Sequence, residues 1–401
     1  MTTFSPTSAS EVLDAVRWAI SEEAPVEILG HGSKRGIGRP AQTEHAIDLS
    51  RLTGVTLYEP EELVLSARAG TPIAEIEALL ADHRQELAFE PMDYGPLSGQ
   101  EAGRGTIGGT LMANLSGPRR IKAGAARDHV LGVHAVSGRG EAFKSGGRVV
   151  KNVTGYDLSK GLAGSWGTLA VATDVTFKVL PAAETERTVV LRGLTEEGAA
   201  FAMAAAMGSS AEVSGAAHLP ETVTGKVIDG MLGGMASTLL RVEGFGPSVD
   251  YRVESLTNLL SSQGEIQTLP CEESRLLWRE IRDCGPFSTD HGKPLWRVSV
   301  TPSQGHAMVM ALRMRTAVDV FYDWQGGLIW MQMDGQPGDE LIRALIAAHG
   351  GGHATLVRAT PSVRAAVQVF QPQPQALASL SARLKEQFDP KGILNPGRMY
   401  G

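Results

Sequence analysis

Three glycine-rich segments interrupt the first 181 residues, and they constrain the fold more than any other feature of the sequence. They run from Leu29 to Gly38, from Gly103 to Arg120 and from Asn152 to Gly167, and apolar runs typical of short strands alternate with them. Glycine weakens helices and strands, so it is favoured where a backbone must approach another group closely. Three such segments in one domain indicate that all of them line one elongated groove.

The first segment, "LGHGSKRGIG", directly follows the expected strand "VEI". The spacing of Gly30, Gly32 and Gly36 differs from the G-x-G-x-x-G dinucleotide fingerprint, and Pro40 interrupts the chain where that fingerprint requires a helix. We therefore do not expect an NAD site of that kind. A loop that cradles a phosphate stays open, because consecutive exposed N–H groups beside Ser33 and Lys34 suit an anion.

The second segment, "GRGTIGGTLMANLSGPRR", predicts a short helix that Thr106 caps. Gly108 and Gly109 fall in its first turn, where each glycine costs about 1 kcal/mol relative to alanine. Two compensations remain open: a ligand at the bare N–H groups of the helix start, or close packing of this helix against a neighbour.

The third segment, "KNVTGYDLSKGLAGSWGTL", is ambiguous by itself. Its polar start precedes an expected helix that contains Gly161 and Gly164, and Gly167 stands before a strand with near-strict alternation of apolar residues. Only its occurrence in one domain with the other two glycine-rich segments favours a ligand groove.

Composition excludes several classes of protein. The chain has 401 residues, which predicts two or three domains, and its net charge of −7 argues against a nucleic-acid partner. Cys271 and Cys284 are its only cysteines, so it lacks the ligands of a four-cysteine iron–sulfur or zinc site. The N-terminal residues do not resemble a signal peptide, and no run of about 18 apolar residues occurs. We expect a cytoplasmic protein, peripheral on the inner membrane only through a complex.

The order of helix and strand patterns predicts an α+β protein. A helix begins near Ser8 or Ser10, four short strands and an amphipathic helix follow, and Pro181 with the polar "AAETER" marks a boundary. From Thr188 onward, strands alternate with helices, which favours an antiparallel sheet with helices on one face. The expected domains are residues 1–181, residues 182–375, and a C-terminal helix with a tail, 376–401, that returns to the first domain.

Four motifs in the first part resemble the FAD-binding domain of the p-cresol methylhydroxylase/vanillyl-alcohol oxidase family: "GHGSKRG", "GTIGGTLMANLSG", "ARDHVLGV" and "GSWGTLAVATDVTFKV". The C-terminal "NPGR" is similar to the tail of the lactate and glycolate dehydrogenase branch. Taken whole, the chain resembles the smaller FAD-binding subunits of bacterial glycolate oxidases (glycolate dehydrogenases). The likeness is strong over residues 1–181 and the last 15 residues, and weak over 185–370.

This resemblance implies a two-subdomain FAD-binding domain followed by an α+β cap domain with an antiparallel sheet. The first loop and the start of the second segment would hold the pyrophosphate of FAD, and the later residues would lie along its ribityl chain and ring. The implied cofactor-binding residues are Gly30, His31, Gly32, Ser33, Lys34, Gly36, Gly105, Thr106, Ile107, Gly108, Gly109, Asn114, Ser116, Gly117, Arg127, Asp128, Lys151, Asn152, Gly155, Tyr156, Asp157, Gly164, Gly167, Leu169, Asn395 and Pro396.

Two departures from the family pattern refine the prediction. Members with covalent FAD often have a histidine at the position of Gly32 or Ser33, so we expect non-covalent FAD and a loop contact from His31. Members that oxidise 2-hydroxy acids usually carry a His-rich segment in the cap domain, whereas Val320 to Met333 contains no histidine. A base must take the hydroxyl proton during such an oxidation. The catalytic residues of this chain therefore stay unassigned.

The sequence thus predicts an FAD-binding subunit of a glycolate dehydrogenase that oxidises glycolate to glyoxylate. A larger FAD-containing subunit would oxidise the substrate, and the FAD of this chain would pass electrons to an iron–sulfur subunit. Two alternatives stay open: a self-sufficient FAD oxidoreductase of another 2-hydroxy acid or alcohol, and a redox-silent flavin-binding assembly subunit.

Four further groups of residues have plain structural explanations beside functional ones. "HGGGH", His349 to His353, has metal-compatible spacing, but it stands where a helix ends on glycines. His129 and His134 are expected on opposite faces of one strand, which disfavours a joint site. The basic residues Arg119, Arg120 and Lys122 could bind a carboxylate or an FAD phosphate, or form a solvated loop or a partner contact. The aromatic run Tyr322–Trp324 is expected in the core, or facing the flavin.

Overall fold

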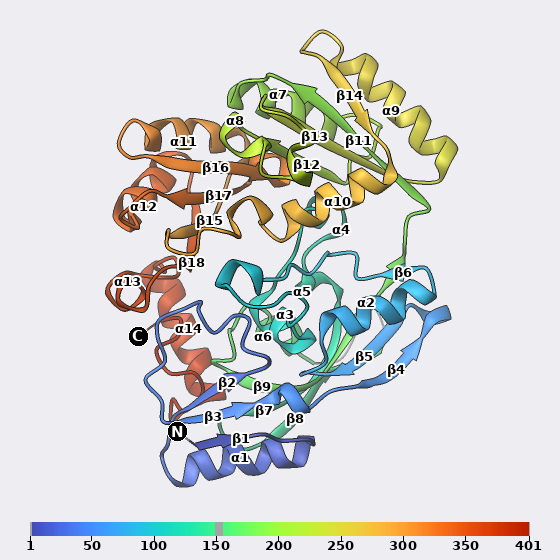
Figure 1. Cartoon of the computed structure of the whole chain (residues 1–401). Coiled ribbons are helices and arrows are strands. Elements are labelled where there is room, and N and C mark those ends of the chain that lie inside the picture. Colours follow the sequence, from blue (N-terminus) through green and yellow to red (C-terminus); the bar gives the residue numbers. More distant parts are fainter. Residues whose placement is uncertain (1, 149–154, 401) are drawn as a thin grey trace.

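Two β-sheets form the N-terminal part of the chain in the computed structural model, which describes residues 2–148 and 155–400 (Figure 1). The first sheet is parallel, with the order β1 (Thr2–Phe4), β3 (His45–Asp48) and β2 (Val26–Leu29). Helix α1 (Ala9–Ser21) begins where predicted, because the Ser8 hydroxyl accepts a hydrogen bond from the N–H of Glu11 at 3.3 Å.

The second sheet of the N-terminal part is antiparallel, and its strands follow the order β4 (Val55–Glu59), β5 (Val64–Arg68), β9 (Ala170–Lys178), β7 (Val130–Ser137) and β8 (Ala142–Gly146). The helices of this part are α2 (Ile73–Asp82), α3 (Ile107–Ala113), α4 (Arg120–Ala123), α5 (Ala126–His129) and α6 (Leu158–Leu162). Apolar residues of both sheets and of α1, α2 and α3 form one buried core. This arrangement is the expected pair of α+β subdomains.

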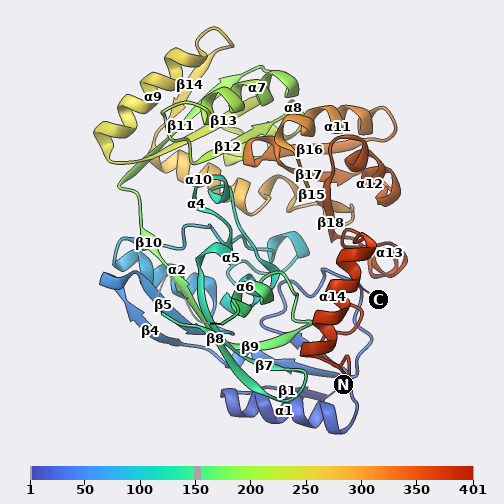
Figure 2. The same cartoon turned by 180° about the vertical axis from the view of Figure 1, so that it is seen from behind.

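An eight-stranded antiparallel sheet forms the second part of the chain. Its order is β14 (Ile266–Leu269), β11 (Thr185–Arg192), β13 (Ser237–Gly244), β12 (Gly215–Leu219), β16 (Val318–Asp323), β17 (Leu328–Met333), β15 (Leu295–Val300) and β18 (Gly352–Arg358). A short two-stranded pairing of β10 (Leu180–Pro181) with β6 (Gln85–Glu86) precedes it. Figure 2 shows β10 and β11 rising along one side of the molecule from the first part to the second.

Helices cover both faces of this sheet, whereas the sequence predicted helices on one face only. Val189 and Leu191 of β11 pack with α7 (Glu196–Met207) and α9 (Gly246–Leu260), while Val190 packs on the other side with α10 (Cys271–Arg282). Alternation of side chains along a strand produces this division. Helix α10 lies between the sheet and the N-terminal part, which is a tertiary placement that helical periodicity does not reveal (Figure 1).

Helices α11 (Gly305–Arg313), α12 (Asp339–Ala348), α8 (Glu221–Thr224) and α13 (Pro361–Ala366) complete the second part. Short 3₁₀ turns connect the elements: η1 (Leu49–Arg51), η2 (Pro60–Glu62), η3 (Pro96–Ser98), η4 (Ile228–Gly230), η5 (Gly285–Phe287), η6 (Pro302–Gln304) and η7 (Trp324–Gly326). Across the described ranges, 2–148 and 155–400, no helix combines the length and apolar character needed to cross a membrane.

The C-terminal helix α14 (Gln375–Phe388) leads the chain back to the first sheet. Leu394 pairs in parallel with Val26 of β2, and the N–H of Asn395 donates to the Val26 carbonyl at 3.0 Å. The buried Asp389 carboxylate fixes the turn after α14, because it accepts hydrogen bonds from the N–H groups of Ile393 and Leu394. The tail therefore extends the edge of the parallel sheet.

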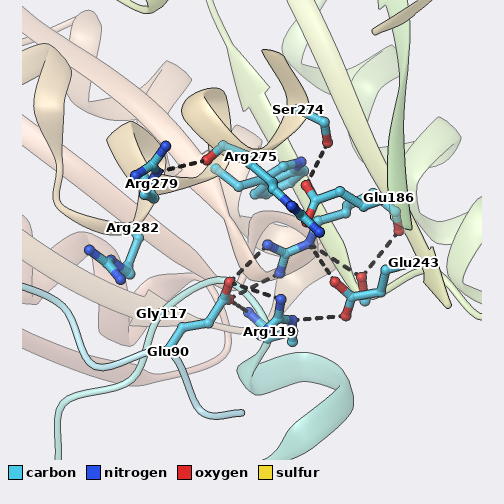
Figure 3. A network of polar contacts seen from close by, with 12 residues as sticks. Glu90, Gly117, Arg119, Glu186, Glu243, Ser274, Arg275, Arg279 and Arg282 are labelled. Carbon is cyan, nitrogen blue, oxygen red and sulfur yellow. Dashed lines mark hydrogen bonds and ion pairs between the residues drawn. The ribbon is translucent and has the colours of Figure 1, made fainter. Parts of the chain in front are cut away.

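A network of buried ion pairs joins the two parts of the chain (Figure 3). Arg241 of β13 donates two hydrogen bonds to the Glu90 carboxylate, at 2.8 and 3.0 Å. Arg119 reaches Glu86 at 2.9 Å and Glu243 at 2.8 Å. We call Glu86, Glu90, Arg119, Arg241 and Glu243 the interface network. Each of its two arginines has a carboxylate within hydrogen-bonding distance. Such pairing is what a buried charge requires.

Candidate functional site

Loops of the N-terminal part and the C-terminal tail surround one cavity, which we call the glycine-loop cavity. Its empty space, the solvent at its mouth included, is about 680 Å³. It is lined by Ile28, Leu29, Gly30, His31, Gly32, Ser33, Lys34, Arg35, Leu49, Ala69, Thr106, Gly108, Gly109, Met112, Ala113, Trp166, Gly167, Ala170, Ala172, Asn395 and Arg398.

The loop after β2 contacts the start of α3, and glycine at position 30 makes this contact possible. A Cβ atom on Gly30 would lie 2.8 Å from the Thr106 hydroxyl, closer than atoms in proteins approach. That hydroxyl accepts a hydrogen bond from the N–H of Gly109 at 3.2 Å, and so caps α3 as predicted. Gly32 has a φ of +78°, a conformation that other residues rarely adopt. These features bring the first two glycine segments together at the cavity.

Two cations of the cavity wall lack an anionic partner. Lys34 and Arg398 form no ion pair within 4.0 Å among the residues that the structure describes. Removal of the Lys34 ammonium from water lowers its pKa to about 8, against the weaker opposing effect of Asp93. Burial also lowers the pKa of Arg398 to about 10. Burying a charge without a partner is costly, so a bound anion would relieve both groups.

Unsatisfied polar atoms support an anionic ligand. Within the described chain, the Nε2 atom of His31 and the Nε atom of Arg398 are buried and form no hydrogen bond. Another nitrogen of Arg398 donates to the Lys34 carbonyl at 2.8 Å, which places this guanidinium against the first loop. Buried polar atoms are nearly always hydrogen-bonded in native proteins, and exceptions are frequent where a ligand supplies the partner. The residues present therefore fit a diphosphate-containing cofactor.

Packing alone explains some of the glycines. A Cβ atom on Gly108 would lie 2.7 Å from the Cβ of Ala69, and one on Gly167 would lie 2.7 Å from the side-chain nitrogen of Asn395. A Cβ atom on Gly109 would lie 3.1 Å from the Cε of Lys34. Close packing, one of the two compensations that the sequence left open, accounts for Gly108, while Gly109 leaves room beside the Lys34 ammonium. The other compensation, a ligand at the start of the helix, stays a prediction.

Asn395 positions the cavity wall from the C-terminal tail. Its side-chain oxygen accepts a hydrogen bond from the N–H of Ile28 at 2.8 Å, and its side-chain nitrogen donates to the Trp166 carbonyl at 2.9 Å. Three segments distant in sequence meet through this one amide. Arg398 lies over the Trp166 ring, with its guanidinium carbon 5.6 Å from the ring centroid.

The structure brings ten of the predicted residues to the cavity wall: Gly30, His31, Gly32, Ser33, Lys34, Thr106, Gly108, Gly109, Gly167 and Asn395. Another fourteen do not line it: Gly36, Gly105, Ile107, Asn114, Ser116, Gly117, Arg127, Asp128, Gly155, Tyr156, Asp157, Gly164, Leu169 and Pro396. The predicted Lys151 and Asn152 lie outside the described residues. Sequence reasoning missed Ile28, Leu29, Arg35, Leu49, Ala69, Met112, Ala113, Trp166, Ala170, Ala172 and Arg398. Trp166 and Arg398 stood in the quoted motifs "GSWG" and "NPGR".

Several of the polar residues that do not line the cavity bind neighbouring backbone instead. The Asn114 side chain accepts a hydrogen bond from the N–H of Arg127 at 3.0 Å, and the Ser116 hydroxyl accepts one from the N–H of Ala126 at 3.0 Å. The Asp157 carboxylate caps α6. These side chains shape the loops around the cavity.

The basic sequence Arg119, Arg120 and Lys122 separates in space. Arg119 belongs to the interface network, and its carboxylate partners leave it unsuited to an FAD phosphate. Lys122 forms a surface ion pair with Glu212 at 3.5 Å. The guanidinium carbon of Arg120 lies 4.3 Å from the centroid of the Trp324 ring.

The histidine pairs do not form metal sites in the described parts of the chain, where no group of three or more metal-binding side chains occurs. His129 ends helix α5 and does not belong to the strand on which it was predicted, while His134 is exposed on β7. His349 ends α12 and His353 lies on β18, in agreement with a helix that stops on glycines.

The run Tyr322–Trp324 lies in the core of the second part, as the structural interpretation predicted. Burial raises the pKa of Asp323 to about 7, although its carboxylate accepts a hydrogen bond from the N–H of Trp324 at 2.7 Å. The Trp324 ring nitrogen donates to the Gly117 carbonyl at 2.9 Å, which links the cap to the N-terminal part.

Comparison with known proteins identifies the class. Residues 2–146 match the family described as "FAD binding domain". The solved structure of p-cresol methylhydroxylase with substrate bound has the same fold, with a TM-score of 0.73, 15% identity, and coverage of 99% of this chain and 88% of that one. The chain therefore has the fold of p-cresol methylhydroxylase and carries an FAD-binding domain, with FAD as the cofactor.

The relatives in sequence are more specific. The glycolate oxidase subunit GlcE of Escherichia coli (strain K12) is 36% identical over 390 residues, which cover 97% of this chain and 96% of that protein. The glycolate oxidase subunit GlcD of Bacillus subtilis (strain 168) is 26% identical over 95% of this chain and 85% of its own length. The chain belongs to the GlcE family of glycolate oxidase subunits.

Proposed function

We propose that this chain is the FAD-binding subunit of a multi-subunit glycolate dehydrogenase that oxidises glycolate to glyoxylate. The observation that carries the proposal is the identity of 36% with GlcE over 97% of the chain, joined to a cavity whose wall holds two cations, Lys34 and Arg398, without an anionic partner among the described residues. The isoalloxazine of bound FAD would supply the electron-accepting chemistry. Lys34 and Arg398 would hold the pyrophosphate, the backbone at Gly109 would approach it, and Asn395 would position the wall.

FAD is non-covalent in this proposal. Gly32 has no side chain for attachment, and Ser33 is buried with its hydroxyl 3.3 Å from the Lys34 ammonium. The proposed division of the chain is an FAD-binding domain (1–181), a cap domain (182–375) and a returning helix and tail (376–401). Hydrogen bonds between the Asn395 side chain and the backbone of Ile28 and Trp166 support the assignment of the tail to the FAD-binding domain.

The chain would relay electrons while a larger FAD-containing subunit oxidises glycolate. The cap segment Val320 to Met333 contains no histidine, and its one carboxylate near the N-terminal part, Asp323, is buried and hydrogen-bonded to backbone. Electrons would then pass to an iron–sulfur subunit, since Cys271 and Cys284 alone cannot hold a cluster. The assembly would place the chain at the inner membrane as a peripheral subunit.

Co-purification tests this assignment. The tagged chain, co-expressed with candidate GlcD-type and iron–sulfur partners, should purify as a complex that reduces an artificial electron acceptor with glycolate. The single chain should bind FAD and show no such activity. Activity of the single chain would instead identify a self-sufficient oxidoreductase, and a complex with full activity after removal of FAD from this chain alone would identify a redox-silent assembly subunit.

A further inference from the structure

The C-terminal tail is anchored up to Asn395, and we call the residues beyond it, 396–400, the tail end. Residues 393–395 are buried, and the Asp389 carboxylate and the edge of the parallel sheet bind their backbone. Gly397 is exposed with a φ of +67°, and a Cβ atom there would meet nothing within 4 Å. Glycine changes its backbone angles at little cost, so Gly397 can serve as a hinge between the anchor and the tail end.

Arg398 docks the tail end against the first glycine segment. Its carbonyl accepts a hydrogen bond from the N–H of Arg39 at 3.1 Å, and its guanidinium donates to the Lys34 carbonyl at 2.8 Å. Glycine at position 38 makes room for this contact, because a Cβ atom on Gly38 would lie 2.8 Å from the Cγ of Arg398. Both hydrogen bonds are polar contacts that water can replace if the segment detaches.

The charges around Arg398 oppose this docking. The side chain is buried, and its Nε atom has no hydrogen-bond partner among the residues that the structure describes. Arg364 of the cap and Arg35 of the first loop both act on it as like charges. Glu27 is the carboxylate that attracts it, but this carboxylate is bound to Arg35 at 2.7 Å. Like charges in a buried environment repel each other strongly, so the docked Arg398 is electrostatically unfavourable without a further anion.

Lys34 adds to this repulsion. Burial lowers the pKa of Lys34 to about 8, Asp93 opposes this effect, and Arg398 adds to it. The Asp93 carboxylate accepts hydrogen bonds from the N–H groups of Gly95 and Gly103 at 2.9 and 2.6 Å. Both cations line the glycine-loop cavity. Of the two, only Arg398 belongs to a segment that a hinge joins to the rest of the chain.

We propose that the tail end is a latch, which docks when the diphosphate of the cofactor occupies the glycine-loop cavity and detaches without it. Pairing of Lys34 and Arg398 with a diphosphate removes the repulsion that opposes docking. Docking and cofactor binding therefore strengthen each other by the same factor. Because the Tyr400 ring lies 6.4 Å from that of Phe370 in the cap, docking also changes the surface where the tail meets the cap. That the diphosphate belongs to FAD rests on the proposed function.

Carboxypeptidase digestion of the full single chain tests the latch. Met399 is half-buried beside Arg398, so its release requires the tail end to detach. Mass spectrometry should show that saturating FAD slows this release by roughly tenfold or more, the usual size of a coupling between two sites. ADP, which carries the diphosphate without the flavin, should also slow it, whereas riboflavin, which lacks phosphate, should leave it unchanged.

The Arg398→Met variant separates the latch from a merely structural role. Methionine keeps an apolar stem and removes the charge, so release of Met399 without FAD should be no faster than in the wild type, and saturating FAD should not slow it. A structural role of Arg398 predicts faster release in both conditions. Lys391→Met is the matched control, since Lys391 is a cation of the same tail that pairs with Glu23 at 3.0 Å; FAD should protect its tail end as in the wild type.

Four results would overturn the latch: equal Met399 release with and without FAD although flavin fluorescence shows binding, protection by FAD that persists in Arg398→Met, loss of protection in Lys391→Met, or protection by FAD but not by ADP. In each of these cases FAD still binds, and the assignment of the cavity stands. Absence of FAD binding in the same fluorescence titration would instead overturn that assignment together with the latch.

Discussion

The glycine-loop cavity and the interface network both bury basic side chains, but they treat the charges in opposite ways. In the network, burial alone would raise the pKa of Glu90, yet Arg119 and Arg241 outweigh burial and hold it at about 2. In the cavity, burial lowers the pKa of Lys34 to about 8, and Asp93 opposes this only weakly. The network completes its own pairs, whereas Lys34 and Arg398 of the cavity have no anionic partner within 4.0 Å among the described residues.

This difference separates structural charges from functional ones. When a buried charge is paired, removal of its partner destabilises the fold, because the remaining charge is left uncompensated. An unpaired buried cation instead lowers the stability of the ligand-free fold, and a bound anion restores that stability. Substitutions in the two regions should therefore have opposite effects on the protein without ligand.

The largest effect is expected in the interface network. Arg241→Met should lower the free energy of unfolding by about 3–5 kcal/mol, because it leaves Glu90 buried with fewer positive partners. Urea denaturation at pH 7 measures it. Arg275→Met is the control, since Arg275 is 44% exposed and 4.0 Å from Glu186; it should cost less than about 1 kcal/mol. Equal losses would contradict the comparison.

In the cavity, Lys34→Met should leave the FAD-free chain at least as stable as the wild type. It should weaken FAD binding by roughly 10- to 100-fold, since a hydrogen bond to a charged group contributes about 1.5–3 kcal/mol. Flavin fluorescence during titration gives the dissociation constant. A variant that unfolds more easily but binds FAD normally would assign Lys34 a structural role.

Gly108 and Gly32 distinguish packing from backbone conformation. Gly108→Ala should destabilise the FAD-free chain by about 1–3 kcal/mol, because the new methyl group collides with Ala69. At Gly32 a methyl group would meet no atom within 4 Å, so Gly32→Ala carries only the strain of φ +78°, about 1 kcal/mol. Thermal unfolding without FAD should rank the two in this order, and the reverse order would refute the packing explanation.

The smallest effect concerns pH. The pKa of Lys34 in the folded chain, about 8, lies below its value of 10.5 in the unfolded chain. Between these values the unfolded chain binds more protons, so stability without FAD rises with pH in this window. FAD affinity should instead fall as pH rises through about 8, by at most tenfold per unit, because the ammonium is lost. Lys34→Met should remove this dependence; an unchanged profile in that variant would exclude Lys34 as its source.

Local patterns predicted much of the fold. Ser8 and Thr106 cap the helices that the sequence indicated, and Asn395 reaches the cavity as the tail motif implied. Such features depend on neighbouring residues or on a recognisable motif. The position of α10 between the two parts depends on long-range packing, which helical periodicity does not encode.

The remaining site residues could not be predicted for the same reason. Arg119 and Arg120 are adjacent in sequence, yet one enters an ion network with Glu243 and the other lies over Trp324, more than one hundred residues away. Gly108 and Gly109 also follow each other and both line the cavity, and only the neighbouring side chains show that Gly108 permits packing against Ala69 while Gly109 leaves room beside Lys34.

The measurement that tests the central claim most directly is an anaerobic visible spectrum of the purified single chain, recorded before and after addition of glycolate and then dithionite. An electron-relay subunit should show an oxidised flavin band that glycolate leaves unchanged and dithionite bleaches. Bleaching by glycolate would mean that the chain oxidises the substrate itself, and absence of a flavin band would contradict the assignment of the glycine-loop cavity to FAD.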